Sequence, residues 1–152
     1  MNEIDYIIDE CNRQHVTNYG DFAKGLDYAR SVSRVFFNQD FGKFVQTIAF
    51  YVEPEVNAVI LHGDRYTNLR RSEVGFMHGG SAAKAVEVPR LFERWAFFVG
   101  EEGTGNEDFF VKQLLDIHPW ADGNGRTASI LRNWLCGSLN DPEPLPYYYG
   151  GK

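Results

Sequence analysis

The nine residues from 118 to 126, His-Pro-Trp-Ala-Asp-Gly-Asn-Gly-Arg, bring together residue types that suit chemistry on phosphate groups. Pro119 disfavours an α conformation at the residue before it, so the sequence predicts that a helix ends at His118 and that a loop begins there. The Gly-Asn-Gly segment that follows can adopt positive φ at little cost and direct consecutive backbone N–H groups into one concavity. A second helix, beginning at Arg126, would turn its N-terminus toward the same concavity, which favours a bound phosphate.

Each polar residue of this loop has a predicted role. His118, as a neutral imidazole, can accept a proton from an attacking hydroxyl group. Asp122 offers a hard oxygen ligand for Mg²⁺. An Arg in the first turn of a helix opposes the helix dipole, so Arg126 indicates an anionic partner. The predicted phosphate-binding residues are Gly123, Asn124, Gly125 and Arg126. The alternative is a plain corner between two helices, in which the glycines only permit the turn.

Residues 118–126 resemble the signature of the Fic family (filamentation induced by cAMP), whose usual form is His-x-Phe-x-Asp/Glu-Gly-Asn-Gly-Arg-x-x-Arg. Two positions depart from that form: Trp120 stands in place of the Phe, and Ser129 stands in place of the second Arg. A Trp can anchor the loop in the core as the Phe does, if its indole N–H finds a partner. In the family the second Arg contacts the terminal phosphate of ATP and pairs with an inhibitory Glu, so Ser129 puts both contacts in question.

The resemblance implies a protein adenylyltransferase. His118 would deprotonate a Ser, Thr or Tyr hydroxyl of a target protein, and that hydroxyl would take AMP from ATP, with Mg²⁺ held at Asp122. The related death-on-curing branch, which resembles a kinase, has a Lys in this loop, whereas Gly125 favours nucleotidyl transfer. Because of Ser129, another nucleoside triphosphate or a diphosphate-linked donor stays open. A non-catalytic nucleotide-binding or interaction module of the same fold is the alternative, and the retained His118 favours the enzyme because a binding module needs no base.

Residues 72–77 and 84–88 are two short runs of β character separated by His78-Gly79-Gly80-Ser81, so the sequence predicts a hairpin. In the Fic family a hairpin at this place is a flap over the nucleotide loop, and it holds the target segment by main-chain pairing. The resemblance thus implies a target-docking strand, which is either residues 84–88 or the run of Ser72, Glu73, Val74, Gly75, Phe76 and Met77. The alternative is a surface hairpin without a partner.

The apolar pattern predicts a mainly α protein, a Fic-type helical bundle with this small hairpin as its flap. We expect one domain over residues 1–152, with a core from about 65 to 139, N-terminal helices within 1–64 and a Pro/Tyr-rich tail at 140–152. Asp21 is predicted to cap the second helix, and residues 44–52 are ambiguous between helix and strand, with helix favoured. The predicted helices cover residues 2–13, 21–37, 44–52, 89–99, 107–117 and 126–139.

Composition narrows the classes of function. A net charge of −6 argues against a broad nucleic-acid-binding surface. Cys11 and Cys136 are too few for a disulfide framework, and the histidines other than His118 have no companions at ligand spacing, so no zinc site is predicted. No signal peptide or membrane-length apolar run occurs, and we expect a cytoplasmic protein without a membrane partner.

Regulation in the Fic family commonly uses a Ser/Thr-x-x-x-Glu-Gly/Asn helix whose Glu meets the second Arg. The chain contains no such string, and Ser129 replaces the Arg that the Glu would meet. We therefore expect a protein that is unrestrained or is controlled by a different device, such as a separate regulator protein.

Overall fold

The computed structural model describes residues 1–32, 41–62, 65–76, 80–102 and 105–146. These segments are mainly helical, as the apolar pattern predicts. The helices are α1 (Glu3–Arg13), α2 (Tyr19–Arg30), α3 (Phe41–Val52), α4 (Val88–Glu102), α5 (Glu107–Ile117) and α6 (Asn124–Cys136). None of them is long and apolar enough to cross a membrane.

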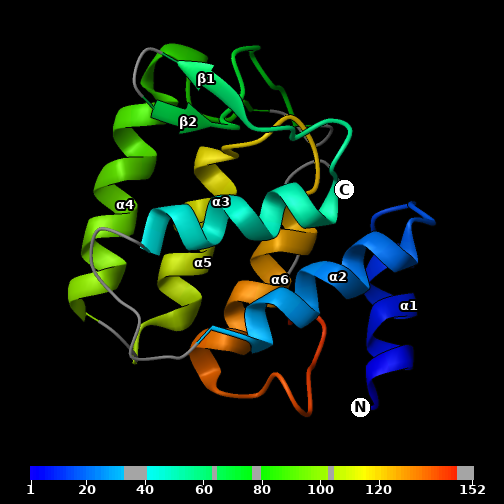
Figure 1. Ribbon diagram of the computed structural model, residues 1–152. Helices are drawn as coiled ribbons and strands as arrows, with labels where there is room; N and C mark the ends of the chain where they lie inside the picture. Colours follow the sequence, from blue (N-terminus) through cyan, green and yellow to red (C-terminus); the bar gives the residue numbers. More distant parts are fainter. Residues whose placement is uncertain (33–40, 63–64, 77–79, 103–104, 147–152) are drawn as a thin grey trace.

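Helix α6 lies at the centre of the bundle and contacts α1, α2, α3 and α5 (Figure 1). All its residues are buried except Arg132, which is partly exposed, and the exposed Cys136 at its end. A helix that is buried on nearly all sides is a core element, because it has almost no face left for solvent. The loop before α6 is therefore attached to the most enclosed element of the fold.

One hydrophobic core joins all six helices. Its aromatic centre includes Phe44 and Trp134, whose ring centroids are 4.7 Å apart, and Phe41, which contacts both Trp95 and Trp134. The indole N–H of Trp95 donates to the Phe110 carbonyl oxygen at 2.8 Å, so this large side chain is buried without losing its hydrogen bond.

Local signals set most helix ends. The Asn2 side chain accepts a hydrogen bond from the Asp5 N–H at 2.8 Å and caps α1. The predicted capping role of Asp21 is wrong: α2 begins at Tyr19, and Asp21 lies inside its first turn. Helix α2 ends at Arg30, earlier than predicted, and the rest of the predicted range, from residue 33, lies outside the described residues. The segment that was ambiguous between helix and strand is a helix, α3.

A two-stranded antiparallel hairpin is present, but it lies earlier in the chain than predicted. Strands β1 (Ile60–His62) and β2 (Arg65–Thr67) pair with Ile60 opposite Thr67. In the described part of 72–88 no strand forms: the residues make a loop with one β-bridge, between Gly75 and Ser81, and then a 3-10 turn, η1 (Ala85–Glu87). Met77 lies outside the described residues.

The physical reason for this difference is competition for backbone groups. The carbonyl oxygens of Ser72 and Ala83 accept hydrogen bonds from the Arg70 side chain, and the Ala83 N–H donates to the Asp116 carbonyl oxygen. One backbone group of the first predicted strand is thus bound to Arg70, the residue before the second is tied to Arg70 and α5, and most of the second forms the 3-10 turn η1.

The described part of the tail, residues 140–146, is held against α1 and α6. The Asn133 side chain on α6 bonds both the N–H and the carbonyl oxygen of Glu143. Leu145 is buried, and its carbonyl oxygen accepts a hydrogen bond from Arg13 at 2.8 Å. The first and last described segments therefore close over the same side of α6.

Candidate active site

His118 ends α5 in a left-handed conformation, with φ 53° and ψ 64°. The helix ends where Pro119 predicts it, and the His118 N–H still bonds the Leu114 carbonyl oxygen at 2.9 Å. A residue other than Gly at positive φ is uncommon, and such a conformation persists only where the surroundings hold it. The imidazole is half-buried.

The loop after His118 is closed by a reciprocal pair of hydrogen bonds. The Asn124 side chain accepts from the Trp120 N–H at 3.0 Å and donates to the Trp120 carbonyl oxygen at 2.9 Å. Trp120 is buried, donates its indole N–H to Asn68 at 3.1 Å, and contacts the ring of Phe92 edge to face. The Asn124 side chain thus holds the shape of the loop, which is a different task from binding phosphate directly.

The start of α6 leaves backbone N–H groups without helical partners. Gly123, at φ 77°, is the N-cap, and the first amide bonded to it within the helix is that of Thr127, at 2.9 Å. The N–H groups of Asn124, Gly125 and Arg126 therefore have no carbonyl oxygen inside α6. This arrangement favours an anion at the helix N-terminus.

Asp122 presents the exposed carboxylate of the loop. Its Oδ1 accepts from the Gly123 N–H at 2.7 Å and lies 3.4 Å from Nη2 of Arg126, while half of its side chain remains open to solvent. In the described segments no group of three or more His, Cys, Asp or Glu side chains could hold a metal ion. A Mg²⁺ ion at Asp122 would therefore need phosphate oxygens and waters as its other ligands, which suits this ion.

Arg126 is buried and already paired. Its Nη1 donates to Glu53 Oε1 and to Asn18 Oδ1, each at 3.1 Å, and the side chain is 1% exposed. Asn18 in turn donates to the same Glu53 oxygen at 2.8 Å. The anionic group beside the α6 N-terminus is thus a side chain of the protein itself, the Glu53 carboxylate. Sequence reasoning missed Glu53 and Asn18, because nothing in their local sequence marks them.

Three buried polar atoms around the start of α6 have no hydrogen-bond partner. They are Nε of Arg126, Oγ1 of Thr127 and Oδ1 of Asn57, whose amide nitrogen bonds the Asp122 carbonyl oxygen. Buried polar groups are nearly always satisfied, so these three atoms are exceptions to the rule within the described residues.

Two described segments, residues 72–76 and 80–83, lie beside the end of α5, and the first of them contacts His118. The ring of Phe76 contacts the imidazole edge to face, with centroids 5.6 Å apart and an interplanar angle of 70°. Between the two segments, the Ala82 N–H bonds the Val74 carbonyl oxygen and the Phe76 N–H bonds the Gly80 carbonyl oxygen. The structure thus brings a part of the segment predicted to dock the target, Ser72 to Phe76, to the predicted base, although this segment is not a strand.

The pKa of His118 is lowered to about 4. Burial is the largest cause, because it disfavours the charged imidazolium, and the positive charge of Arg70 acts in the same direction. The negative charge of Asp122 and a hydrogen bond to the Leu115 backbone oppose them. His118 is therefore a neutral proton acceptor at neutral pH.

Ser129 belongs to a buried polar network. Its hydroxyl bonds Glu10 Oε2 at 2.9 Å and the Tyr6 hydroxyl at 2.8 Å, both from α1. Glu10 also accepts from the Leu145 N–H at 3.0 Å, and Arg13 lies 3.8 Å from it. Ser129 thus points into a buried network with α1 and the tail. Position 129 offers no positively charged side chain to the loop.

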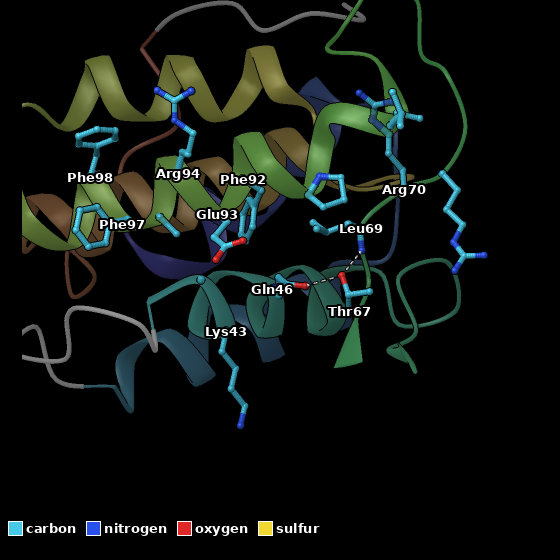
Figure 2. A pocket seen from close by; sticks show the side chains of 16 residues that line it. Lys43, Gln46, Thr67, Leu69, Arg70, Phe92, Glu93, Arg94, Phe97 and Phe98 are labelled. Carbon is cyan, nitrogen blue, oxygen red and sulfur yellow. Dashed lines mark hydrogen bonds between the residues drawn. The ribbon is translucent and has the colours of Figure 1, made fainter. Parts of the chain in front are cut away.

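A cavity of about 970 Å³ lies between α3 and α4. Apolar groups such as Leu69, Phe92 and Phe97 line it, and Lys43 and Arg94 point away from each other on the outer sides of the two helices (Figure 2). None of residues 118–126 lines this cavity. Two of its lining residues contact the loop: Arg70 bonds the His118 carbonyl oxygen, and the Phe92 ring packs on Trp120. Its charges do not converge on one point, so we assign it no chemistry.

The described residues form a mainly helical protein, in which a histidine with a lowered pKa ends α5 and a helix N-terminus with unpaired backbone N–H groups begins α6. Comparison with protein-family models and with curated proteins finds no significant match to this chain.

Proposed function

We propose that the chain is a Fic-type protein adenylyltransferase, which transfers AMP from ATP to a hydroxyl side chain of a target protein. The observation that carries the proposal is the first turn of α6. It combines three backbone N–H groups free of helical partners, the Arg126 guanidinium and orphaned buried polar atoms, six residues from a histidine that is neutral at neutral pH. Free N–H groups occur at the start of every helix, so the proposal depends on their combination here with a buried Arg and a nearby neutral histidine.

In the proposed reaction the target hydroxyl oxygen attacks the α-phosphorus of ATP. His118 accepts the hydroxyl proton, the new O–P bond forms, and the bond from the α-phosphorus to the bridging oxygen breaks, so pyrophosphate leaves. The α6 N-terminus and Arg126 stabilise the charge that builds up on the phosphate oxygens. The loop does its work mainly by positioning, because its backbone is fixed by Asn124 and Trp120 before any substrate binds.

Asp122 would hold Mg²⁺, since its carboxylate is the exposed one in the loop. Bound there, the ion would neutralise charge on the phosphates and the leaving pyrophosphate. The described residues hold no group of three or more His, Cys, Asp or Glu side chains that could bind a metal, which fits an ion that arrives with the nucleotide.

Because position 129 is a Ser, the identity of the nucleotide donor has to be found by experiment. In the Fic family the second Arg contacts the terminal phosphate of ATP, and here that position is Ser129, whose hydroxyl bonds Glu10 and Tyr6. A donor with fewer phosphates would lose less than ATP from this change, because it has no terminal phosphate for that Arg to contact. The other nucleoside triphosphates share the triphosphate of ATP, so only their bases would distinguish them.

The target segment would lie along residues 72–76, beside Phe76 and His118. We propose that this loop serves as the flap: its outer backbone groups pair with an extended target segment and bring the hydroxyl to the imidazole. The proposal needs one free edge of backbone on the loop rather than a complete hairpin.

Intact-protein mass spectrometry tests the proposal. The chain is incubated with Mg²⁺ and, in separate reactions, ATP, GTP, CTP and UTP, with and without cell lysate as a source of targets. We expect a nucleoside-monophosphate mass gain on the chain or on a lysate protein, and its loss in His118→Ala. A matched control is His15→Ala, since His15 lies at the end of α1, outside this loop. No gain with any donor or lysate, together with retained nucleotide binding, would instead favour a non-catalytic binding module.

A further inference from the structure

Arg70 is a buried cation whose hydrogen bonds all go to backbone oxygens. Nε donates to the His118 carbonyl oxygen, and the two Nη atoms donate to Ile117, Ser72 and Ala83, at distances from 2.5 to 3.0 Å. The side chain is 4% exposed. Its own N–H adds a fifth bond, to the Pro119 carbonyl oxygen at 2.8 Å.

These partners belong to separate segments that no helix or sheet joins. One segment is the end of α5 and the start of the loop 118–126, with Ile117, His118 and Pro119. The other partners, Ser72 and Ala83, lie on the segments beside His118. A planar guanidinium with five N–H donors in fixed directions can hold several such acceptors, and a Lys ammonium cannot match that geometry. Arg70 thus acts as a clamp that links Ser72 and Ala83 to the backbone around His118.

The clamp also explains how His118 keeps its left-handed backbone. The three carbonyl groups that Arg70 binds, at 117, 118 and 119, surround the peptide units on both sides of His118. Since φ and ψ of His118 are set by the orientation of these peptide units, fixing them fixes the direction in which the imidazole leaves the chain.

We propose that Arg70 is a positioning residue for His118, which sets the orientation of the imidazole and joins it to the target-docking loop so that both move as one unit. This inference rests on the proposed function for its consequence, namely that His118 and the target hydroxyl meet in a fixed geometry. Arg70 touches neither substrate nor reacting atoms in this role.

The positive charge of Arg70 has a second effect, on the pKa of His118. After burial, the positive charge of Arg70 is the next cause that lowers the pKa of the His118 imidazole, against the opposing charge of Asp122. Removing the cation should therefore move the His118 titration to higher pH. If Arg70 acted only through packing, its replacement would leave the pKa of His118 unchanged.

Nuclear magnetic resonance on the full chain tests the proposal without any need for activity. In the wild type, the amide protons of Ala82, Ala83 and His118 are each hydrogen-bonded within the unit. We expect them to exchange with solvent with one common free energy of opening. Exchange of the two alanine amides at least about tenfold faster than that of His118 would overturn the coupling, because the loop would then open alone.

The variants Arg70→Lys and Arg70→Met, with Arg71→Met as matched control, supply the second arm. We expect both Arg70 variants to speed exchange of the Ala83 and His118 amides by at least about tenfold, and only Arg70→Met to raise the His118 pKa. If self-labelling is active, its kcat should fall by about 100-fold in both. Unchanged exchange and titration in the Arg70 variants would overturn the inference, whereas absent labelling in the wild type would count only against the proposed function. If Arg70→Met fails to fold, Arg70→Lys and the wild-type exchange still decide the coupling.

Discussion

The guanidinium of Arg126 and the carboxylate of Glu53 meet at 3.1 Å beside the N-terminus of α6. Glu53 follows directly on α3, and its contact with Arg126 spans 73 positions of the chain. A helix N-terminus favours a negative charge, and here the protein supplies one itself. Under the proposed function, a donor phosphate and Glu53 compete for the same cation.

We predict that Glu53→Gln increases nucleotide affinity. Loss of the negative charge leaves Arg126 free to bind phosphate, so the Kd for the Mg²⁺ complex of the donor should fall by at least about tenfold, which corresponds to roughly 1.4 kcal/mol. Isothermal titration calorimetry measures this change, and the self-labelling rate at low donor concentration should rise with it.

Glu55→Gln is the matched control for this substitution, because Glu55 is exposed and lies two residues away. It removes the same charge without touching Arg126. Equal affinity gains in both variants would mean that general charge, rather than the Glu53 contact, limits binding.

The pH dependence of the reaction should follow His118. Its pKa lies at about 4 in the folded protein, below the ordinary value of 6.5, chiefly through burial and then through Arg70. The folded state therefore binds fewer protons than the unfolded chain between these two values, so the His118 contribution destabilises the fold as pH falls from 6.5 through 4 and is constant above 6.5. We expect the acid limb of the labelling rate near pH 4.

Proton chemical shifts of the imidazole ring, followed as pH is lowered, measure this pKa directly, and His118→Gln assigns the signal. A midpoint at or above 6.5 would contradict the burial argument. The base would then be partly protonated at neutral pH and less able to accept the hydroxyl proton.

Trp120 should matter through its indole nitrogen as well as through its volume. Trp120→Ala removes a buried aromatic side chain and should lower the free energy of unfolding by about 3–5 kcal/mol. Trp120→Phe keeps an aromatic ring in the core but leaves Asn68 Oδ1 without its donor, which should cost about 1–3 kcal/mol. Urea denaturation measures both, and Phe97→Leu on the exposed side of α4 should change stability by less than about 0.5 kcal/mol.

Ser129→Ala should destabilise the protein although it removes a single oxygen. Glu10 and Tyr6 would each lose a hydrogen bond while staying buried, at a cost of about 1–3 kcal/mol. Ser31→Ala is the control, because the Ser31 hydroxyl makes one exposed local bond, to the Tyr28 carbonyl oxygen. A similar small change in both variants would show that the network adds little to stability.

Gly123→Ala should destabilise the start of α6. The residue has φ 77°, and an added Cβ would lie 3.1 Å from Cγ1 of Val52, so we expect a loss of about 1–2 kcal/mol from the backbone conformation alone. Gly20→Ala gives the opposite sign: Gly20 is in α2 with open space around it, and Ala is the better helix former by up to about 1 kcal/mol. Thermal unfolding compares the two variants.

Local sequence determined the features that depend on backbone chemistry over a few residues. Pro119 ended α5 at His118, Gly123 allowed the positive φ before α6, and the 3.6-residue apolar pattern gave a mainly helical chain. Such signals act within one or two helical turns, so they can be recognised without knowing which segments meet.

Tertiary structure decided which groups surround the loop. Glu53 and Asn18 pair with Arg126, Glu10 meets Ser129, and Arg70 binds the carbonyl groups around His118, in contacts that span from 47 to 119 positions of the chain. Arg70 and α5 also bind backbone groups of Ser72 and Ala83, at the start of the first predicted strand and just before the second. Contacts between distant segments depend on how the helices pack around α6, and that packing is a property of the whole chain rather than of any short stretch of it.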